Sequence, residues 1–306
     1  MRVVVAGLGV QGHKRRRFAG ADYVASVDPA NTDADYRSLH DVPVNLYDAV
    51  LACIPDEPKF DLVRYCIDHG KHVLIEKPLW TRRDEDIRQL EQSAQSRGVV
   101  IYTAYNHRFE PHFVRMRDLI SSGELGAIYS CRMFYGNGTA RLVRDSAWRD
   151  RGAGVIPDLG SHLLDTCRFW FGDILDGLKL ISANRFENRA PDHAIIAADG
   201  QQPRIELEMT LCMWRNHFTC DILAERGTAH IESLCKWDPT TFRHRHRVLP
   251  SGHPPEIAIT LVQEDPTWAL EYEHFKKLCN ERASTDLSND FILQRALTRL
   301  TKDAVA

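Results

Sequence analysis

Short apolar runs alternate with helix-like patterns over the first hundred residues of the chain. The apolar runs occupy 3–7, 23–28, 48–55, 72–76 and 99–105. Apolar residues at helical spacing lie between them, and they predict helices from about residue 12, over 59–70 and over 82–98. The last two of these helices end at a glycine, a common C-terminal signal. Apolar strands that alternate with helices predict a parallel sheet covered on both faces.

A different pattern begins after residue 105. A helical stretch at 111–123 leads into segments in which apolar and polar residues alternate, as they do in antiparallel strands. These segments are 128–136, 178–187, 193–200, 204–214 and 218–233. Helices are expected at about 158–171, 267–282 and 289–304. We therefore predict an α/β domain over 1–105 and an α+β domain with an open, mostly antiparallel sheet over 106–306, with the C-terminal helix packing back on the first domain as an open alternative.

The composition of the chain argues against several classes of protein. The 306 residues are 43% hydrophobic and 26% charged, with a formal net charge of −3, so neither nucleic acid nor an anionic membrane is implied as a partner. No apolar run approaches the ~20 residues of a membrane span, and the first residues lack the plan of a signal peptide. The eight cysteines include no C-x-x-C pair and no zinc-like spacing. We therefore expect a cytoplasmic protein with reduced thiols.

A glycine-rich turn follows the first strand. Gly7, Gly9 and Gly12 form a G-x-G-x-x-G pattern between a strand and a helix, where glycines let the backbone approach a pyrophosphate at the helix N-terminus. Asp28 ends the next strand, 21 residues after Gly7, where an acid would hold a ribose hydroxyl. This context predicts a Rossmann-type domain. The residues expected at the dinucleotide are Gly7, Gly9, Val10, Gln11, Gly12 and Asp28.

Opposing charges bear on the choice between NAD and NADP. The Asp28 carboxylate would repel the 2′-phosphate of NADP and therefore favours NAD. The run His-Lys-Arg-Arg-Arg at 13–17 places cations in the first turns of a helix, where the helix dipole disfavours them. These cations are either solvated or face an anion, which would be the pyrophosphate or a 2′-phosphate. We predict NAD as the cofactor, with NADP as the alternative.

A lysine ends the fourth apolar run. Lys77 follows the strand-like stretch 73–75 and lies between Glu76 and Pro78. A solvated lysine needs no apolar strand leading to it, although a simple pair with Glu76 would also account for the residue. Lys77 is thus a candidate for chemistry at the end of a strand.

An acid and an imidazole occur together in the second half of the chain. In a helix that begins near Asp158, Asp158 and His162 would lie four residues apart on one face. A histidine titrates near neutrality, which suits proton transfer. The preceding Gly152-Ala153-Gly154 suggests backbone close to a ligand.

The motifs occur in a fixed order along the chain. They are the glycine turn, GKHVLIEKPL at 70–79, YNHRFEP at 105–111 and GAGVIPDLGSHLLD at 152–165. Together they resemble the Gfo/Idh/MocA family of NAD(P)-dependent oxidoreductases, which includes glucose–fructose oxidoreductase and inositol dehydrogenase. The resemblance covers nearly the whole chain.

The resemblance implies hydride transfer between a nicotinamide and a secondary alcohol or ketone of a sugar, sugar derivative or cyclitol. It also implies a homodimer or homotetramer built on the second domain's sheet. The implied catalytic residues are Lys77, Asp158 and His162. The further residues implied at the cofactor are Ile54, Pro55, Glu76 and Lys77, and those implied at the substrate are Lys77, Asn106, Arg108, Asp158 and His162. Arg149 is a further candidate at the substrate because it precedes the glycine run.

The chain also departs from the family pattern. Only 20 residues separate Asp28 from Asp48, which is too few for two full strand–helix crossovers. The family's second helix or third strand is therefore expected to be shortened or lost. Lys59 stands where many members have a histidine.

Two other segments have open interpretations. His244 and His246 would share one face of a strand and could bind a metal, but the interleaved arginines favour a solvated edge strand or loop over 242–248. No metal site is predicted. Trp148, Arg149 and Arg151 either contact substrate or serve as packing and solvated charge at the domain junction.

Two other function classes would use the same fold. One is a catalytically silent, cofactor-bound regulatory protein, which would have no need of Lys77, Asp158 and His162 together. The other is an NAD-dependent glycosidase, which oxidises its sugar transiently and regenerates the cofactor. Net cofactor turnover separates a dehydrogenase from both.

Overall fold

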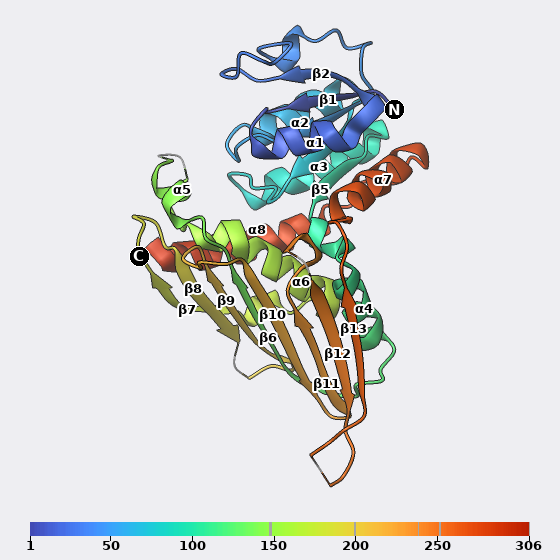
Figure 1. The fold of residues 1–306 in the computed structure, drawn as a ribbon. Coiled ribbons are helices and arrows are strands. Elements are labelled where there is room, and N and C mark those ends of the chain that lie inside the picture. The colour runs from blue at the N-terminus through green and yellow to red at the C-terminus, as the bar shows by residue number, and fades with distance from the viewer. Residues whose placement is uncertain (147–148, 199, 238, 251, 306) are drawn as a thin grey trace. The chain divides into compact units, whose positions relative to one another are not determined.

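The computed structural model describes residues 1–146, 149–198, 200–237, 239–250 and 252–305. It contains two compact units (Figure 1). The first combines Met1–Asn106 with Thr267–Arg295, and the second combines His107–Pro266 with Ala296–Ala306. Helix α8 (Ser288–Val305) contributes to both units. Among the described residues, no helix is both long enough and apolar enough to cross a membrane.

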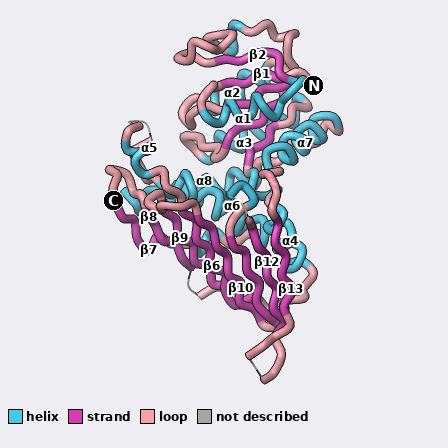
Figure 2. The backbone as a smooth tube through the Cα atoms, viewed as in Figure 1, coloured by secondary structure: helices cyan, strands magenta, loops and turns pink. Residues whose placement is uncertain are grey.

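The first unit is built on a sheet of five strands in the order β2-β1-β3-β4-β5 (Figure 2). Its strands are β1 (Val3–Ala6), β2 (Tyr23–Val27), β3 (Ala49–Ala52), β4 (His72–Glu76) and β5 (Ile101–Ala104). Every neighbouring pair is parallel. The predicted parallel α/β sheet is confirmed.

Both faces of this sheet are covered by helices, because alternate strand residues point to opposite faces. On one face the strands pack against α2 (Lys59–Asp68) and α3 (Asp84–Arg97). On the other face they pack against α1 (Val10–Ala19) and α7 (Thr267–Asn280). The second face is thus covered in part by a helix from the far end of the chain.

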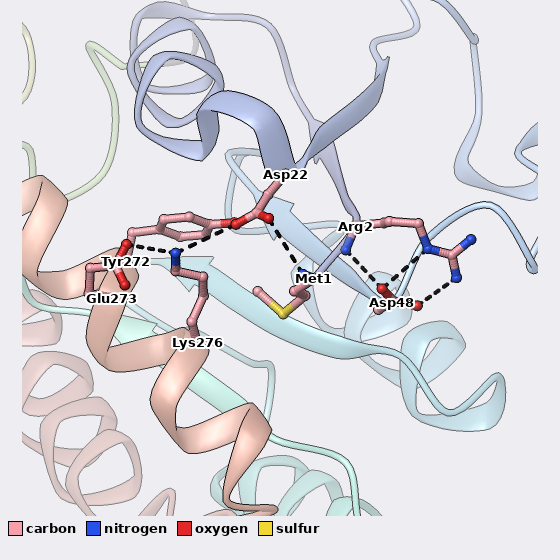
Figure 3. Close-up of polar contacts among 7 residues, drawn as sticks. All are labelled: Met1, Arg2, Asp22, Asp48, Tyr272, Glu273 and Lys276. Atoms are coloured by element: carbon pink, nitrogen blue, oxygen red, sulfur yellow. Dashed lines mark hydrogen bonds and ion pairs between the residues drawn. The ribbon is translucent and has the colours of Figure 1, made fainter.

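Helix α7 is held to the first unit by apolar and polar contacts. Phe275 is fully buried against the sheet. The Tyr272 hydroxyl donates to Asp22 Oδ2 at 2.9 Å, and Lys276 Nζ lies 3.6 Å from the same oxygen (Figure 3). The amino group of Met1 lies 3.4 Å from Asp22 Oδ1. The carboxylate of Asp22 therefore contacts both α7 and the residue Met1, which leads into β1.

The connection from β2 to β3 is short. Residues 28–48 are all described, and the helix they contain is the single 3₁₀ turn η2 (Leu39–Asp41). An isolated parallel bridge pairs Val27 with Tyr36. The expected loss of a full helix–strand crossover in this segment is confirmed.

The second unit contains a sheet of eight strands in the order β13-β12-β11-β10-β6-β9-β8-β7. Its strands are β6 (Ile128–Gly136), β7 (Lys179–Asn184), β8 (His193–Ala198), β9 (Arg204–Thr210), β10 (His217–Ala224), β11 (Gly227–Glu232), β12 (Thr240–His246) and β13 (Glu256–Leu261). Only β6 and β9 pair in parallel among these strands. The predicted open, mostly antiparallel sheet is confirmed.

One face of this sheet is covered by α4 (Pro111–Ser121) and α6 (Ser161–Phe171), as Figure 1 shows. A short helix, α5 (Ala140–Arg144), follows β6. Alternate strand residues are buried under the helices, whereas the residues between them form cross-strand ion pairs. Arg132 Nε lies 3.1 Å from Glu206 Oε1, and Arg245 Nε lies 2.6 Å from Glu256 Oε2. This second face therefore carries ion pairs beside exposed apolar side chains such as Leu223.

The expectation of a solvated edge strand or loop at 242–248 is wrong. Strand β12 lies between β11 and β13 and pairs with both. Phe242 and His244 are buried, while Arg243 and Arg245 alternate with them toward the face that carries the ion pairs. Interleaved arginines do not mark an edge here, because alternation of this kind also suits an interior strand with one solvated face.

Candidate active site

The residues predicted to bind the cofactor follow the carboxyl ends of the parallel strands. Gly7 follows β1, Asp28 follows β2, Ile54 and Pro55 come after β3, and Lys77 follows β4. Because the strands are parallel, their carboxyl ends share one edge of the sheet. The strand order reverses direction at β1 and β3, and open α/β sheets bind ligands at such a switch point.

The three glycines of the turn have different neighbours. A Cβ on Gly7, whose φ is +91°, would lie 2.3 Å from the carbonyl oxygen of Cys53. A Cβ on Gly12 would lie 1.8 Å from the carbonyl oxygen of Gly7. A Cβ on Gly9 would meet no atom within 4 Å. Packing in the described structure therefore accounts for Gly7 and Gly12, whereas Gly9 leaves open space over the turn, where a pyrophosphate would approach.

Helix α1 presents its N-terminus beside that space. It begins at Val10, two residues before the predicted start near Gly12, and Val10 and Gln11 are exposed. Its N-cap residue, Gly9, makes no side-chain capping bond, and the first turn contains no acidic residue. Backbone N–H groups at such a helix start bind anions well. The turn therefore fits the pyrophosphate of a dinucleotide.

Asp28 is held in place by backbone amides. Its Oδ2 accepts from the N–H of Leu8 at 2.8 Å, and its Oδ1 accepts from Ala30 and Asn31 at 2.9 and 2.8 Å. Partial burial would raise the pKa of Asp28, but these three hydrogen bonds outweigh it and the pKa is lowered. Asp28 is therefore an oriented carboxylate next to the glycine turn.

One residue of the basic run 13–17, Arg15, is neither a solvated cation nor free to bind a cofactor. Arg15 is 1% exposed, and its Nε donates to Glu76 at 2.7 Å while its Nη2 donates to Glu271 at 2.6 Å. Its guanidinium carbon lies 4.3 Å from the ring centre of Trp268. Burial would lower the pKa of Arg15, but the two carboxylates outweigh it and raise the pKa. For Arg15 both sequence interpretations are wrong, because its anions are two glutamates of the chain.

Lys59 supports the segment that carries Lys77. Lys59 is buried, and its Nζ donates to Asp56 at 2.7 Å and to the carbonyl oxygens of Glu76 and Pro78 at 2.7 and 2.6 Å. The last two carbonyls belong to the residues on either side of Lys77, which is itself half-buried. Burial lowers the pKa of Lys59, against the pull of Asp56. Lys59 thus fixes the backbone around Lys77.

In the second unit, Asp158 lies in an irregular helical turn. The helix begins earlier than predicted, with a π-helical turn, η4 (Ile156–Gly160), that runs into α6. Single π turns are rare and frequently occur at functional sites. Asp158 Oδ2 lies 3.4 Å from Arg149 Nη2, so the structure brings two predicted site residues together.

His162 packs in a cluster of rings. It stacks on His107 with ring centres 4.2 Å apart and an interplanar angle of 22°, and its ring centre lies 6.1 Å from that of Tyr135. The Tyr135 hydroxyl accepts from Lys236 Nζ at 3.0 Å. His107, Tyr135 and Lys236 were not among the predicted site residues. His107 could have been noted within YNHRFEP, whereas Tyr135 and Lys236 are separated from His162 along the chain and carry no local signal.

The two residues selected from YNHRFEP make contacts within their own units. Asn106 is buried, and its Nδ2 donates to Thr267 Oγ1 at 2.9 Å. Arg108 donates to the carboxylate of Asp165 through Nε at 2.9 Å and through Nη2 at 2.6 Å. Asp165 is 1% exposed, so this pair ties the start of the second unit to α6.

Gly154, before Asp158, has a structural role. Gly154 has a φ of +51°, and a Cβ there would lie 2.1 Å from the carbonyl oxygen of Pro191. The close neighbour of this backbone is therefore another loop of the same unit, and no ligand is required to explain it. Trp148 lies outside the described residues.

Models of one oxidoreductase family match both parts of the chain. The model described as "Oxidoreductase family, NAD-binding Rossmann fold" matches residues 1–105, and the "GFO/IDH/MocA C-terminal domain" matches residues 113–230. The chain is 31% identical over 126 residues to scyllo-inositol 2-dehydrogenase (NADP(+)) IolW of Bacillus subtilis (strain 168), which covers 40% of this chain and 34% of that protein. The match spans only about a third of that relative's length.

Two further proteins are similar over more of the chain. Inositol 2-dehydrogenase 2 of Mycolicibacterium vanbaalenii is 25% identical over 265 residues, which covers 76% of this chain and 72% of that protein. A solved structure of levoglucosan dehydrogenase in complex with NADH and levoglucosan aligns with a TM-score of 0.82 at 16% identity, covering 100% of this chain and 97% of the other. At 16% identity, this similarity shows a shared fold only. The sequence resemblance is confirmed by the two family models, and the chain belongs to the Gfo/Idh/MocA family of oxidoreductases.

Proposed function

We propose that the protein is an NAD(P)-dependent oxidoreductase that transfers hydride between a nicotinamide and a secondary alcohol or ketone of a sugar, sugar derivative or cyclitol. The observation that carries the proposal is the glycine turn, where Gly9 alone of the three glycines has open space above it. The family assignment and the names of the relatives support the substrate class.

NAD is the proposed cofactor, with NADP as the alternative. The Asp28 carboxylate is ionised and oriented by three amides, which supports recognition of a free ribose hydroxyl. Arg15 is engaged by Glu76 and Glu271, so it offers no support for a 2′-phosphate site. One relative is named for NADP, which keeps the alternative open.

The proposed chemistry is a proton transfer coupled to hydride loss. The bound nicotinamide supplies the hydride acceptor. His162 takes the proton of the substrate hydroxyl, and Lys77 stabilises the developing alkoxide as a cation. Asp158, held near Arg149, orients the imidazole or modulates its charge. With the roles exchanged, a neutral Lys77 would take the proton.

The remaining proposed contacts involve the substrate and a second copy of the chain. Asn106 and Arg108 are proposed near the substrate because of the family resemblance, and Arg149 because it precedes the glycine run and pairs with Asp158. A homodimer or homotetramer is also proposed because of the family resemblance, and exposed apolar side chains such as Ile181 and Trp214 support it. Light scattering checks this against the chain mass of 35.0 kDa.

The test is a panel of sugars, inositols and nucleotide sugars assayed for NADH or NADPH formation. On the best substrate, His162→Ala should lower turnover by about 10²- to 10⁴-fold, the usual contribution of a positioned general base. NAD affinity should change little. His217→Ala, an exposed histidine of β10, is the matched control and should keep full turnover. Near-wild-type turnover of both His162→Ala and Lys77→Ala would place the chemistry elsewhere.

A further inference from the structure

Three potential metal ligands converge at the end of strand β12. His244 Nδ1 lies 3.7 Å from Glu124 Oε1, and His246 Nδ1 lies 3.8 Å from the same oxygen. One ligand atom from each of the three residues lies within 4.8 Å of the others. The two imidazole ring centres are 4.2 Å apart. None of these residues belongs to the proposed active site.

The fold itself produces this convergence. Alternation along β12 puts His244 and His246 on the same face, the one that packs against α4. Glu124 lies in the turn just after α4, and its backbone N–H donates to Ser122 Oγ at 3.2 Å. The helix and the strand therefore bring together residues that are 120 positions apart along the chain.

The ligand spacing is close to that of a bound ion. Zinc bonds to histidine nitrogen and carboxylate oxygen are about 2.0–2.1 Å long, so tetrahedral ligands lie about 3.3 Å apart. The two measured separations of 3.7 and 3.8 Å exceed this by only a few tenths of an ångström. His244 is buried, whereas the side chains of His246 and Glu124 are 38% and 50% exposed and have room to close on an ion.

The site also has space for further ligands. A groove of about 460 Å³ lies between α4 and the strands β12 and β13, and both Glu124 and His244 line it. Its walls include Val114, Leu119 and Ile257. Three protein ligands that border an open groove leave a coordination position for water or a small anion, as in zinc sites with three protein ligands.

We propose that Glu124, His244 and His246 form a binding site for a divalent transition-metal ion, and we take Zn²⁺ as the probe. Two imidazoles and one carboxylate suit zinc and its neighbours in the first transition series, whereas Mg²⁺ prefers sites made of oxygen. The ion joins the turn after α4 to the end of strand β12. It therefore stabilises the second unit.

The experiment uses the untagged full-length chain, stripped with a chelator and titrated with ZnCl₂ by calorimetry. One Zn²⁺ should bind per chain, and saturation at about 100 times Kd should raise the Tm by about 5 °C or more. His246→Gln and Glu124→Gln, both at partly exposed positions, should each weaken binding at least tenfold and reduce the Tm shift. MgCl₂ should produce neither signal.

His230→Gln is the matched control. This histidine lies on the same sheet beside a carboxylate, with its Nδ1 2.6 Å from Asp221 Oδ1, but it is not one of the three converging ligands. Its Zn²⁺ affinity should equal that of the wild type. Absence of stoichiometric binding, or equal binding by the wild type, His246→Gln and Glu124→Gln, would overturn the proposal.

Discussion

The two units differ in the kind of basic side chain that they bury. In the parallel-sheet unit, Arg15 and Lys59 are each 1% exposed and bind carboxylates or backbone carbonyls. In the antiparallel-sheet unit, His107, His112 and His244 are buried beside other rings. One unit therefore buries cations, and the other buries imidazoles.

This difference matches the tasks proposed for the two units. A buried cation is costly unless every partner is in place, so Arg15 and Lys59 hold the backbone at the cofactor edge in one arrangement. Imidazoles are neutral near physiological pH and can take a proton or a metal. The second unit thus holds groups that can change their protonation or ligands, whereas the buried charges of the first unit are fixed by their partners.

Removal of the buried cation should have the largest effect. Arg15→Met leaves Glu76 and Glu271 without their shared partner, and loss of one member of a buried ion pair typically costs about 3–5 kcal/mol. The free energy of unfolding from urea titration should fall by that amount. Arg17→Met, at an exposed position of the same helix, should change it by less than about 0.5 kcal/mol. Equal small losses for both variants would show that the Arg15 network contributes little.

Substitutions in the glycine turn should affect stability and cofactor binding separately. Gly12→Ala should destabilise the chain by about 1–3 kcal/mol, because the new methyl group would overlap the Gly7 carbonyl oxygen. Gly9→Ala should leave the unfolding free energy nearly unchanged and weaken NAD binding at least tenfold, because it fills the space proposed for the pyrophosphate. Calorimetric titration with NAD and NADP measures both affinities. A Gly9→Ala variant with wild-type NAD affinity would contradict the proposed cradle.

Lowering the pH should have a smaller effect on stability, through protonation of the buried imidazoles. Burial lowers the pKa of His112, whose Nε2 lies 3.3 Å from the carbonyl oxygen of Thr240. A base whose pKa is lowered by folding stabilises the protein above its unfolded pKa of about 6.5, and that stability is lost as the pH falls through the folded value.

The wild type should therefore lose free energy of unfolding between pH 7 and pH 5. This loss should be smaller in His112→Gln. One proton contributes a slope of at most about 1.4 kcal/mol per pH unit. His13→Gln, at an exposed position of α1, should keep the wild-type slope. Urea unfolding at a series of pH values measures this, and an unchanged slope in His112→Gln would rule out a contribution from that ring.

Most strands and helices, and the glycine turn, were predictable from the sequence alone, whereas β13 and α5 were not predicted. These features have local signals: apolar residues repeat with the period of the element, and Gly7, Gly9 and Gly12 stand between a strand and a helix. The short segment between Asp28 and Asp48 was also predictable, because chain length limits what can fit between two strands. Lys77, Asp158 and His162 were selected by residue type and family resemblance, and their catalytic roles remain predictions.

Contacts between distant residues depended on how the whole chain folds. Arg15 binds Glu271, 256 positions away, and so one arginine of a basic run expected to face solvent or a cofactor became part of the core. Strand β12 became central because β13 pairs with it, which brought His244 and His246 to Glu124. Local periodicity tells which face of an element is apolar. The partner of a buried charge or imidazole depends on which element packs against that face, and this is determined only when the whole chain folds.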